Sequence, residues 1–168
     1  ALAKPAILPS VTLNEILPSP EGQDAAEEWI ELLNNSDSAI DVAGWQITDT
    51  KGNIKSYAFP INTQIPGQGY LVLARPNTKI TLNNDSDGLQ LINKGVVVET
   101  IKYAKAPKGQ SFNRTESGWV WSKNLTPGSK NVISNLENKN QLKTEEQKIA
   151  KKLGEKKRAA NVSEQVPE

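Results

Sequence analysis

Short runs of apolar residues, many of them alternating with polar ones, fill most of this chain before residue 135. Such runs predict half-buried strands. The runs are residues 11–17, 29–33, 40–47, 54–59, 70–74, 80–82, 89–92, 96–103 and 119–122. Turn-forming residues recur between them about every 8–12 positions, which is typical of all-β domains. The pattern therefore predicts eight or nine short strands in a β-sandwich or barrel.

Three details of the pattern refine this prediction. Residues 70–74 are apolar at every position, which favours a central strand covered on both faces. Asn93-Lys94-Gly95 has the composition of a tight hairpin turn. Residues 105–113 show no regular period and are expected to be irregular.

The predicted structural core contains Trp29, Trp45 and Trp119. The chain has only four tryptophans, three tyrosines and two phenylalanines. In a chain with so few aromatic residues, these large rings are expected to supply much of the buried surface.

Composition divides the chain into a predicted linker at 1–10, a sandwich at 11–134 and a charged tail at 135–168. Eight basic and six acidic residues crowd the tail, which has no aromatic residue. Thr144 to Gln147 is typical of a helix start, and Leu142, Ile149 and Leu153 form a thin apolar stripe. The tail is thus expected to be helical or disordered, because three apolar side chains offset little ordering entropy.

The bulk numbers exclude several classes of site. The chain has neither histidine nor cysteine, so it cannot build a Ser-His-Asp triad, a thiol nucleophile or a thiolate zinc site by itself. No apolar stretch approaches the roughly 20 residues of a spanning helix. Because the chain begins at Ala1 and contains no methionine, we expect a mature product or an excised piece of a longer protein.

A series of short motifs carries a family resemblance. The motifs are Leu13-Asn14-Glu15-Ile16, Glu28 to Leu32 with Asn34, Gly44 to Asp49, Ile65-Pro66-Gly67 before Tyr70 to Leu73, Leu82-Asn83-Asn84 before Gly88 to Leu91, and Tyr103, Ser111, Arg114, Trp119, Trp121, Thr126-Pro127-Gly128 and Asn131. Over residues 11–131 this series resembles the lamin-tail domain in its bacterial form. The resemblance implies an immunoglobulin-like β-sandwich with no catalytic residues of its own and no cofactor. It also implies a domain that is often attached to exported or surface proteins, sometimes beside a nuclease or another catalytic domain.

Two glutamates stand out because they interrupt apolar strands. Glu15 and Glu31 occupy matching places in neighbouring predicted strands, where an unpaired charge is costly. We expect one of them to form an ion pair with Arg114. A catalytic carboxylate pair of the glycosidase type is the alternative.

Two further clusters have a structural and a functional interpretation. Asn83, Asp85 and Asp87 match the first half of a calcium loop, but Lys94 stands where the bidentate glutamate belongs, so a hairpin tip is favoured over a metal site. Lys102, Lys105 and Lys108 are expected to protect a solvated strand edge, with phosphate contact as the alternative.

The sequence therefore favours a non-enzymatic binding or spacer module of an exported or surface-attached bacterial protein. Its partner would be a protein or a cell-surface component, and its location extracellular or on the cell surface, with a cytoplasmic location left open. The alternatives are a nucleic-acid-associated module that binds weakly through its basic tail, and an auxiliary domain of a nuclease or hydrolase. Residues 1–134 carry twelve basic and thirteen acidic groups, so electrostatic binding to nucleic acid is expected only in the tail.

Overall fold

The computed structural model describes residues 9–133. The chain divides between Ile133 and Ser134 into two units. Most of the predicted linker and the whole predicted tail, including the helix start at Thr144 and the stripe of Leu142, Ile149 and Leu153, lie outside the described residues.

The described part contains eleven strands and two one-turn helices. The strands are β1 (Val11–Ser19), β2 (Trp29–Asn34), β3 (Ile40–Asp41), β4 (Gln46–Asp49), β5 (Ser56–Ala58), β6 (Gln64–Ile65), β7 (Tyr70–Ala74), β8 (Asp87–Asn93), β9 (Val96–Tyr103), β10 (Gln110–Thr115) and β11 (Gly118–Ser122). The helices are α1 (Asp24–Glu27) and α2 (Arg75–Thr78), and neither is long enough to cross a membrane. The strand number exceeds the prediction because β3 and β6 are too short to show alternation. The polar strand β10 lies largely in the segment expected to be irregular, and residues 80–82 form no strand.

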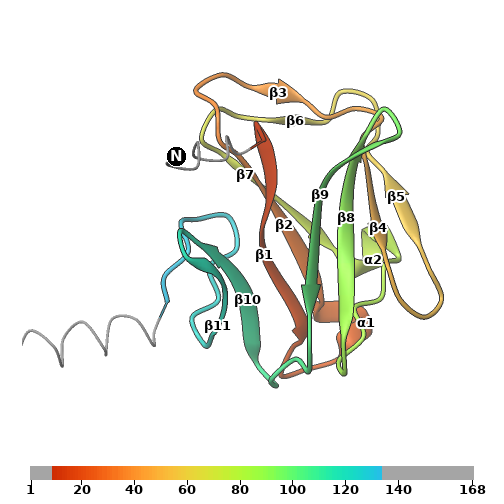
Figure 1. Cartoon of the computed structure of the whole chain (residues 1–168), viewed down its shortest axis with the longest axis vertical. Helices are drawn as coiled ribbons and strands as arrows, with labels where there is room; N and C mark the ends of the chain where they lie inside the picture. The colour runs from red at the N-terminus through yellow and green to blue at the C-terminus, as the bar shows by residue number, and fades with distance from the viewer. Residues whose placement is uncertain (1–8, 134–168) are drawn as a thin grey trace, which may run out of the picture. The chain divides into compact units, whose positions relative to one another are not determined.

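The strands form a sandwich of two antiparallel sheets. One sheet has the order β11-β10-β1-β2-β7 and the other the order β5-β4-β8-β9. The small β3–β6 ladder lies across one end of the strands, and α1 lies at the opposite end (Figure 1). The predicted all-β, immunoglobulin-like β-sandwich is confirmed.

The predicted strand at 40–47 is wrong as a single element. The chain turns between Val42 and Trp45, where the Trp45 N–H donates to the Val42 carbonyl at 3.0 Å. Gly44 takes a φ of +75° in this turn, a conformation that costs glycine little. The turn ends β3 and starts β4, which joins the four-stranded sheet.

The tight turn predicted at 93–95 joins β8 to β9. Lys94 and Gly95 form a two-residue loop with φ values of +48° and +78°. Two positive φ values in succession match the twist of antiparallel strands. This turn lets β9 run back along β8 from Val96 to Tyr103.

The composition of β7 predicts a central strand. In the structure, β7 lies at the edge of the five-stranded sheet. The central strand is β1, which pairs with β2 on one side and with β10 on the other. The prediction failed because apolar residues on both faces reveal what a strand packs against and not how many neighbours it has.

The core is mainly aliphatic, with Phe59 and Tyr103 as its buried aromatic residues, and the three predicted core tryptophans are only half-buried. Trp45 and Trp119 pack against the core from its margin, whereas Trp29 pairs with Ala74 on the face of the sheet turned away from the core. The largest fully buried apolar side chains are Leu13, Ile16, Ile30, Leu32, Ile47, Ile65, Ile80, Leu89 and Leu91. Branched side chains on the facing strands fill the narrow space between the sheets.

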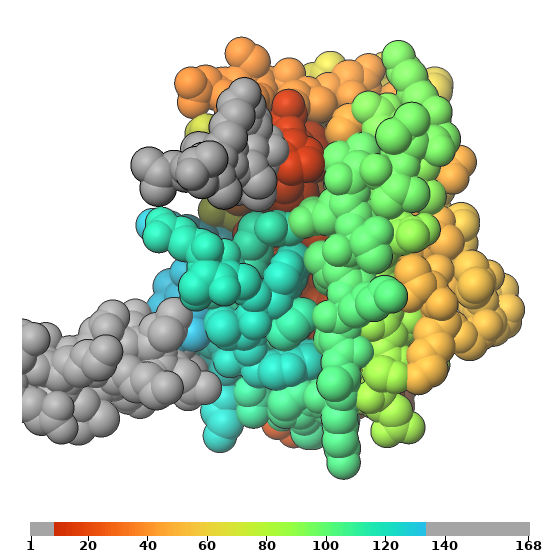
Figure 2. All heavy atoms as spheres, in the orientation of Figure 1, coloured from red at the N-terminus to blue at the C-terminus, as the bar shows by residue number. Residues whose placement is uncertain are grey.

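An aromatic cluster joins the β10–β11 hairpin to β9. Phe112 lies between Trp119 and Trp121, with ring centroids 5.2 and 4.6 Å away. Tyr103 of β9 meets Trp121 edge to face at 5.9 Å. The hairpin and β9 accordingly lie side by side in Figure 2.

We expect Leu32→Ala to lower the free energy of unfolding by about 2–5 kcal/mol, because Leu32 is fully buried between the sheets. Urea denaturation followed by tryptophan fluorescence measures this change. The control is Ile61→Ala, at a loop position that is 84 % exposed, which should change the stability by no more than about 0.5 kcal/mol. Equal losses for the two variants would show that Leu32 is not a core residue.

Candidate functional site

Glu15 and Glu31 lie directly opposite each other on β1 and β2. Their neighbours Ile16 and Ile30 point into the core, so both glutamates point to the other, outer face of the five-stranded sheet. Both are nonetheless 0 % exposed. The outer face is therefore covered here, and the cover comes from the end of the described chain.

Asn14 makes this arrangement possible because it is an extra residue in β1. Leu13 faces Leu32, but Glu15 faces Glu31, so two positions on β1 correspond to one on β2. This β-bulge keeps Leu13 facing the core while Glu15 still faces outward. The Asn14 side chain donates to Glu31 Oε1 at 2.7 Å and to Asn131 Oδ1 at 2.8 Å.

The segment after β11 crosses over the two carboxylates and donates hydrogen bonds to both. The Thr126 N–H and Oγ1 donate to Glu15 Oε1 and Oε2 at 3.1 and 2.7 Å. The Gly128 N–H donates to Glu31 Oε2 at 2.5 Å. Ser111 Oγ on β10 adds a bond to Glu15 Oε1 at 2.6 Å. We call Glu15, Glu31 and these donors, with Asn14, the carboxylate clamp.

The clamp is not a catalytic pair. Every oxygen of both carboxylates accepts a hydrogen bond from the protein, and neither side chain reaches solvent. The pKa of Glu31 is raised, mainly because the group is buried and also because the Glu15 carboxylate is close. The hydrogen bonds from Gly128 and Asn14 act in the opposite direction and lower this pKa. A substrate has no access to either group, so the glycosidase alternative is wrong.

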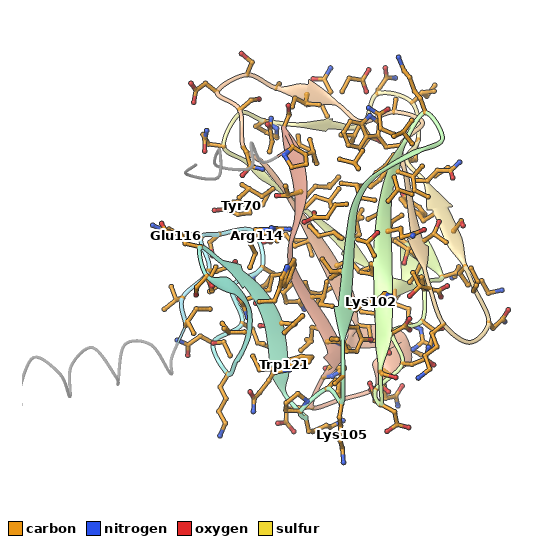
Figure 3. The ribbon with its side chains drawn as sticks, in the orientation of Figure 1. Tyr70, Lys102, Lys105, Arg114, Glu116 and Trp121 are labelled. Carbon is orange, nitrogen blue, oxygen red and sulfur yellow. The ribbon has the colours of Figure 1, made fainter. Side chains whose placement is uncertain are left out.

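The predicted ion pair of Arg114 with Glu15 or Glu31 is also wrong. Arg114 follows Asn113, the cross-strand partner of Glu15, so its side chain leaves the opposite face of the sheet. There it forms an ion pair with Glu99 of β9 and lies 4.9 Å over the Trp119 ring. Figure 3 labels Arg114 beside β10.

Arg114 and Glu99 form hydrogen bonds with the backbone of Leu13, in a part of β1 that does not pair with β10. Arg114 Nε donates to the Leu13 carbonyl at 2.7 Å, and the Leu13 N–H donates to Glu99 Oε2 at 2.7 Å. The two charged groups therefore close an otherwise unpaired edge of β1 and link the two sheets. The sequence gives little sign of Glu99, since it lies in an ordinary strand pattern.

A third buried glutamate, Glu28, directly follows α1. Its Oε1 accepts from Arg75 Nη1 at 2.9 Å, and its Oε2 accepts from the Leu82 N–H at 3.0 Å. Desolvation outweighs these partners, and Asp24 adds repulsion, so the pKa of Glu28 rises to about 7. This group ionises near neutral pH.

The candidate calcium residues form a closed loop. Asp87 is buried, and its Oδ2 accepts from both the backbone and the side-chain nitrogen of Asn83 at 3.0 and 2.6 Å. Asp85 is exposed, away from these bonds. Within residues 9–133 no cluster of acidic side chains has the arrangement of a metal site. Internal hydrogen bonds explain the pattern at Asn83, Asp85 and Asp87 better than a cation does.

A shallow hollow of about 260 Å³ lies beside this loop and is lined by Thr50, Lys51, Ser86, Asp87, Lys102 and Tyr103. Lys102, Lys105 and Lys108 are exposed, and Lys105 extends away from the strand ends in Figure 3. The prediction of a lysine at a solvated edge holds for Lys102, which lies in the edge strand β9, whereas Lys105 and Lys108 follow the end of that strand.

Comparison with protein families matches residues 6–105 to the Lamin Tail Domain. The chain belongs to the lamin tail domain family. Comparison with curated proteins gives no match. Lamin tail domains are a non-enzymatic, immunoglobulin-like family, in agreement with the inaccessible carboxylates.

In this lamin tail domain the motifs that seem separate in sequence contact one another. Asn14 and Glu15 come from the first motif, while Thr126, Gly128 and Asn131 come from the last. Sequence reasoning identified both glutamates and the loop but missed their contact. The available signal was a pair of strand acids, Glu15 and Glu31, with no basic residue in either of their own strands. Such a pair indicates hydroxyl and N–H donors as alternatives to a basic partner.

We expect Thr126→Val to lower the free energy of unfolding by about 1–3 kcal/mol, because it removes a hydroxyl donor from a buried carboxylate with little change in shape. Chemical denaturation measures the loss. Thr100→Val is the matched control, at an exposed strand position. A loss no larger than that of the control would mean that the clamp contributes nothing to stability.

The raised pKa of Glu28 predicts a pH dependence. Between about pH 4.5 and 7 the folded domain keeps the Glu28 proton that the unfolded chain releases, so stability falls as pH rises through this window. Glu28→Gln should make the unfolding free energy depend less on pH between pH 5 and 7.5. Glu116→Gln, at an exposed turn, should leave the pH dependence as it is in the parent chain. Parallel pH profiles for the parent chain and Glu28→Gln would contradict the assignment.

Proposed function

We propose that this lamin tail domain is a non-catalytic binding or spacer module of an exported or surface-attached bacterial protein. The observation that supports it best is the closed carboxylate clamp. The paired acids of β1 and β2, Glu15 and Glu31, are fully occupied by hydrogen bonds from the protein itself. The buried pair serves to hold the last loop against the sheet.

Export and surface attachment rest on the family resemblance, because bacterial domains of this type are commonly joined to exported or surface proteins. A sandwich suits a spacer, since its two sheets are tied by packing and by the Arg114–Glu99 pair. Exposed edge strands and loops then provide the surfaces for a partner.

The proposal predicts that protease added to intact cells of the source organism removes this chain. A cytoplasmic protein probed in the same samples should remain intact, because the protease does not enter cells. Immunoblotting with an antibody against residues 9–133 measures both outcomes. Protection of the chain until the cells are lysed would overturn surface attachment.

A second function, weak nucleic-acid binding, is favoured by the eight basic and six acidic residues of 135–168. Duplex DNA titrated against the full chain at low salt tests it, because counterion release makes such binding fall steeply as salt rises. Salt-sensitive binding that is lost when the chain ends at Ser134 would favour this second function.

A further inference from the structure

Strand β7 exposes one side of its backbone. The Asn34 N–H donates to the Gly69 carbonyl, and the Arg75 N–H donates to the Glu28 carbonyl, so residues 69 and 75 face β2. Backbone groups in an antiparallel strand alternate in direction, which turns Leu71 and Leu73 toward β2 as well. The N–H and C=O groups of Tyr70, Val72 and Ala74 therefore point away from the sheet.

Within residues 9–133 these outward groups have no hydrogen-bond partner. No strand pairs with β7 on that side, and no turn or side-chain hydrogen bond reaches Tyr70, Val72 or Ala74. The Val72 side chain is 39 % exposed on the outer face, opposite Glu31 in β2. Figure 3 labels Tyr70, at the start of this strand.

The edge also lacks the features that normally prevent strands from pairing. Folded proteins protect sheet edges with charged residues, prolines, bulges or very short strands. Strand β9 carries Lys102 and an irregular register near Ile92, and β5 has only three residues. The five residues of β7 contain no charge and no proline, and their register with β2 is continuous.

We propose that β7 pairs antiparallel with β7 of a second copy of this chain, about a two-fold axis at Val72. This pairing makes each outward residue both a donor and an acceptor, since Val72 faces Val72 and Tyr70 faces Ala74 of the second copy. The two five-stranded sheets then form one continuous sheet.

The side chains favour this occupant. A large ring at Tyr70 lies opposite a small residue at Ala74, so the two copies fit without a clash between bulky groups. No like charges meet, because β7 is uncharged. The inference goes beyond the proposed function and does not depend on where the protein is located.

Single cysteines in the full chain, which has none of its own, test the register. Val72→Cys should give a disulfide-linked dimer under mild oxidation, because directly paired residues have Cα atoms about 5.5 Å apart, within disulfide range. Tyr70→Cys alone should not, since its two copies would be about 13 Å apart along the strands. Mixing Tyr70→Cys with Ala74→Cys should give the mixed dimer. Val97→Cys on β9, 47 % exposed, is the control for random collision.

Sedimentation velocity tests the association without cross-links. The sedimentation coefficient of the full chain should rise with concentration, and Val72→Lys should weaken self-association at least about tenfold while the melting temperature stays near that of the parent. Equal cross-linking of Val72→Cys and Val97→Cys, or a monomer at every concentration, would overturn the proposal.

If the chain is monomeric, the rate at which a thiol reagent modifies Val72→Cys shows whether another segment of the chain covers the edge. A slow reaction at Val72→Cys would mean that the chain's own segments cover the edge. A fast reaction would mean that the edge is open to another protein.

Discussion

Two carboxylates buried side by side on the outer face of a sheet are the constraint on which this domain depends. Glu15 and Glu31 face each other across β1 and β2, and neither has a basic partner among the described residues. Such groups cost several kcal/mol unless hydrogen bonds replace the water they lose. Here the donors come from the bulge at Asn14, from Ser111 on β10 and from the loop at Thr126 and Gly128. The acids are therefore stable only when distant parts of the chain are assembled.

This requirement extends the cooperative unit beyond the family match. The match ends at residue 105, yet β10, β11 and the loop that follows them supply the donors of the clamp and the arginine that closes the edge of β1. A domain that ended at residue 105 would leave Glu15 without Ser111 and Thr126, and Leu13 without Arg114. The later motifs of the resemblance, from Ser111 to Asn131, are thus part of the same sandwich.

Alternation along the chain was enough to predict the sandwich and to place β1, β2, β7 and β9 within a residue or two, because these strands are long or apolar enough to show a period. It also identified Glu15 and Glu31 as opposed residues. The partners were not predictable, since one residue of register decides the face. Arg114 lies next to a residue that faces Glu15, and for that reason it points away from both glutamates and meets Glu99. The partial burial of the tryptophans was equally unpredictable from the sequence, because the burial of a side chain depends on the turn at Gly44 and on which face of the sheet a loop covers.

The faces and the edges of the sheets differ in how many of their polar groups are already hydrogen-bonded, and this difference indicates where the domain can interact. Its opposed carboxylates, Glu15 and Glu31, are closed by internal hydrogen bonds, and the hollow beside Asp87 is shallow. Backbone donors and acceptors along β7 are, by contrast, directed away from the sheet on an uncharged strand and have no partner among the described residues. A new strand can form directional backbone hydrogen bonds with β7 without displacing any hydrogen bond already present in the described part. A ligand at the clamp would first have to break several hydrogen bonds. Recognition by this lamin tail domain is therefore expected at a sheet edge, where binding adds to the fold and leaves its buried charges undisturbed.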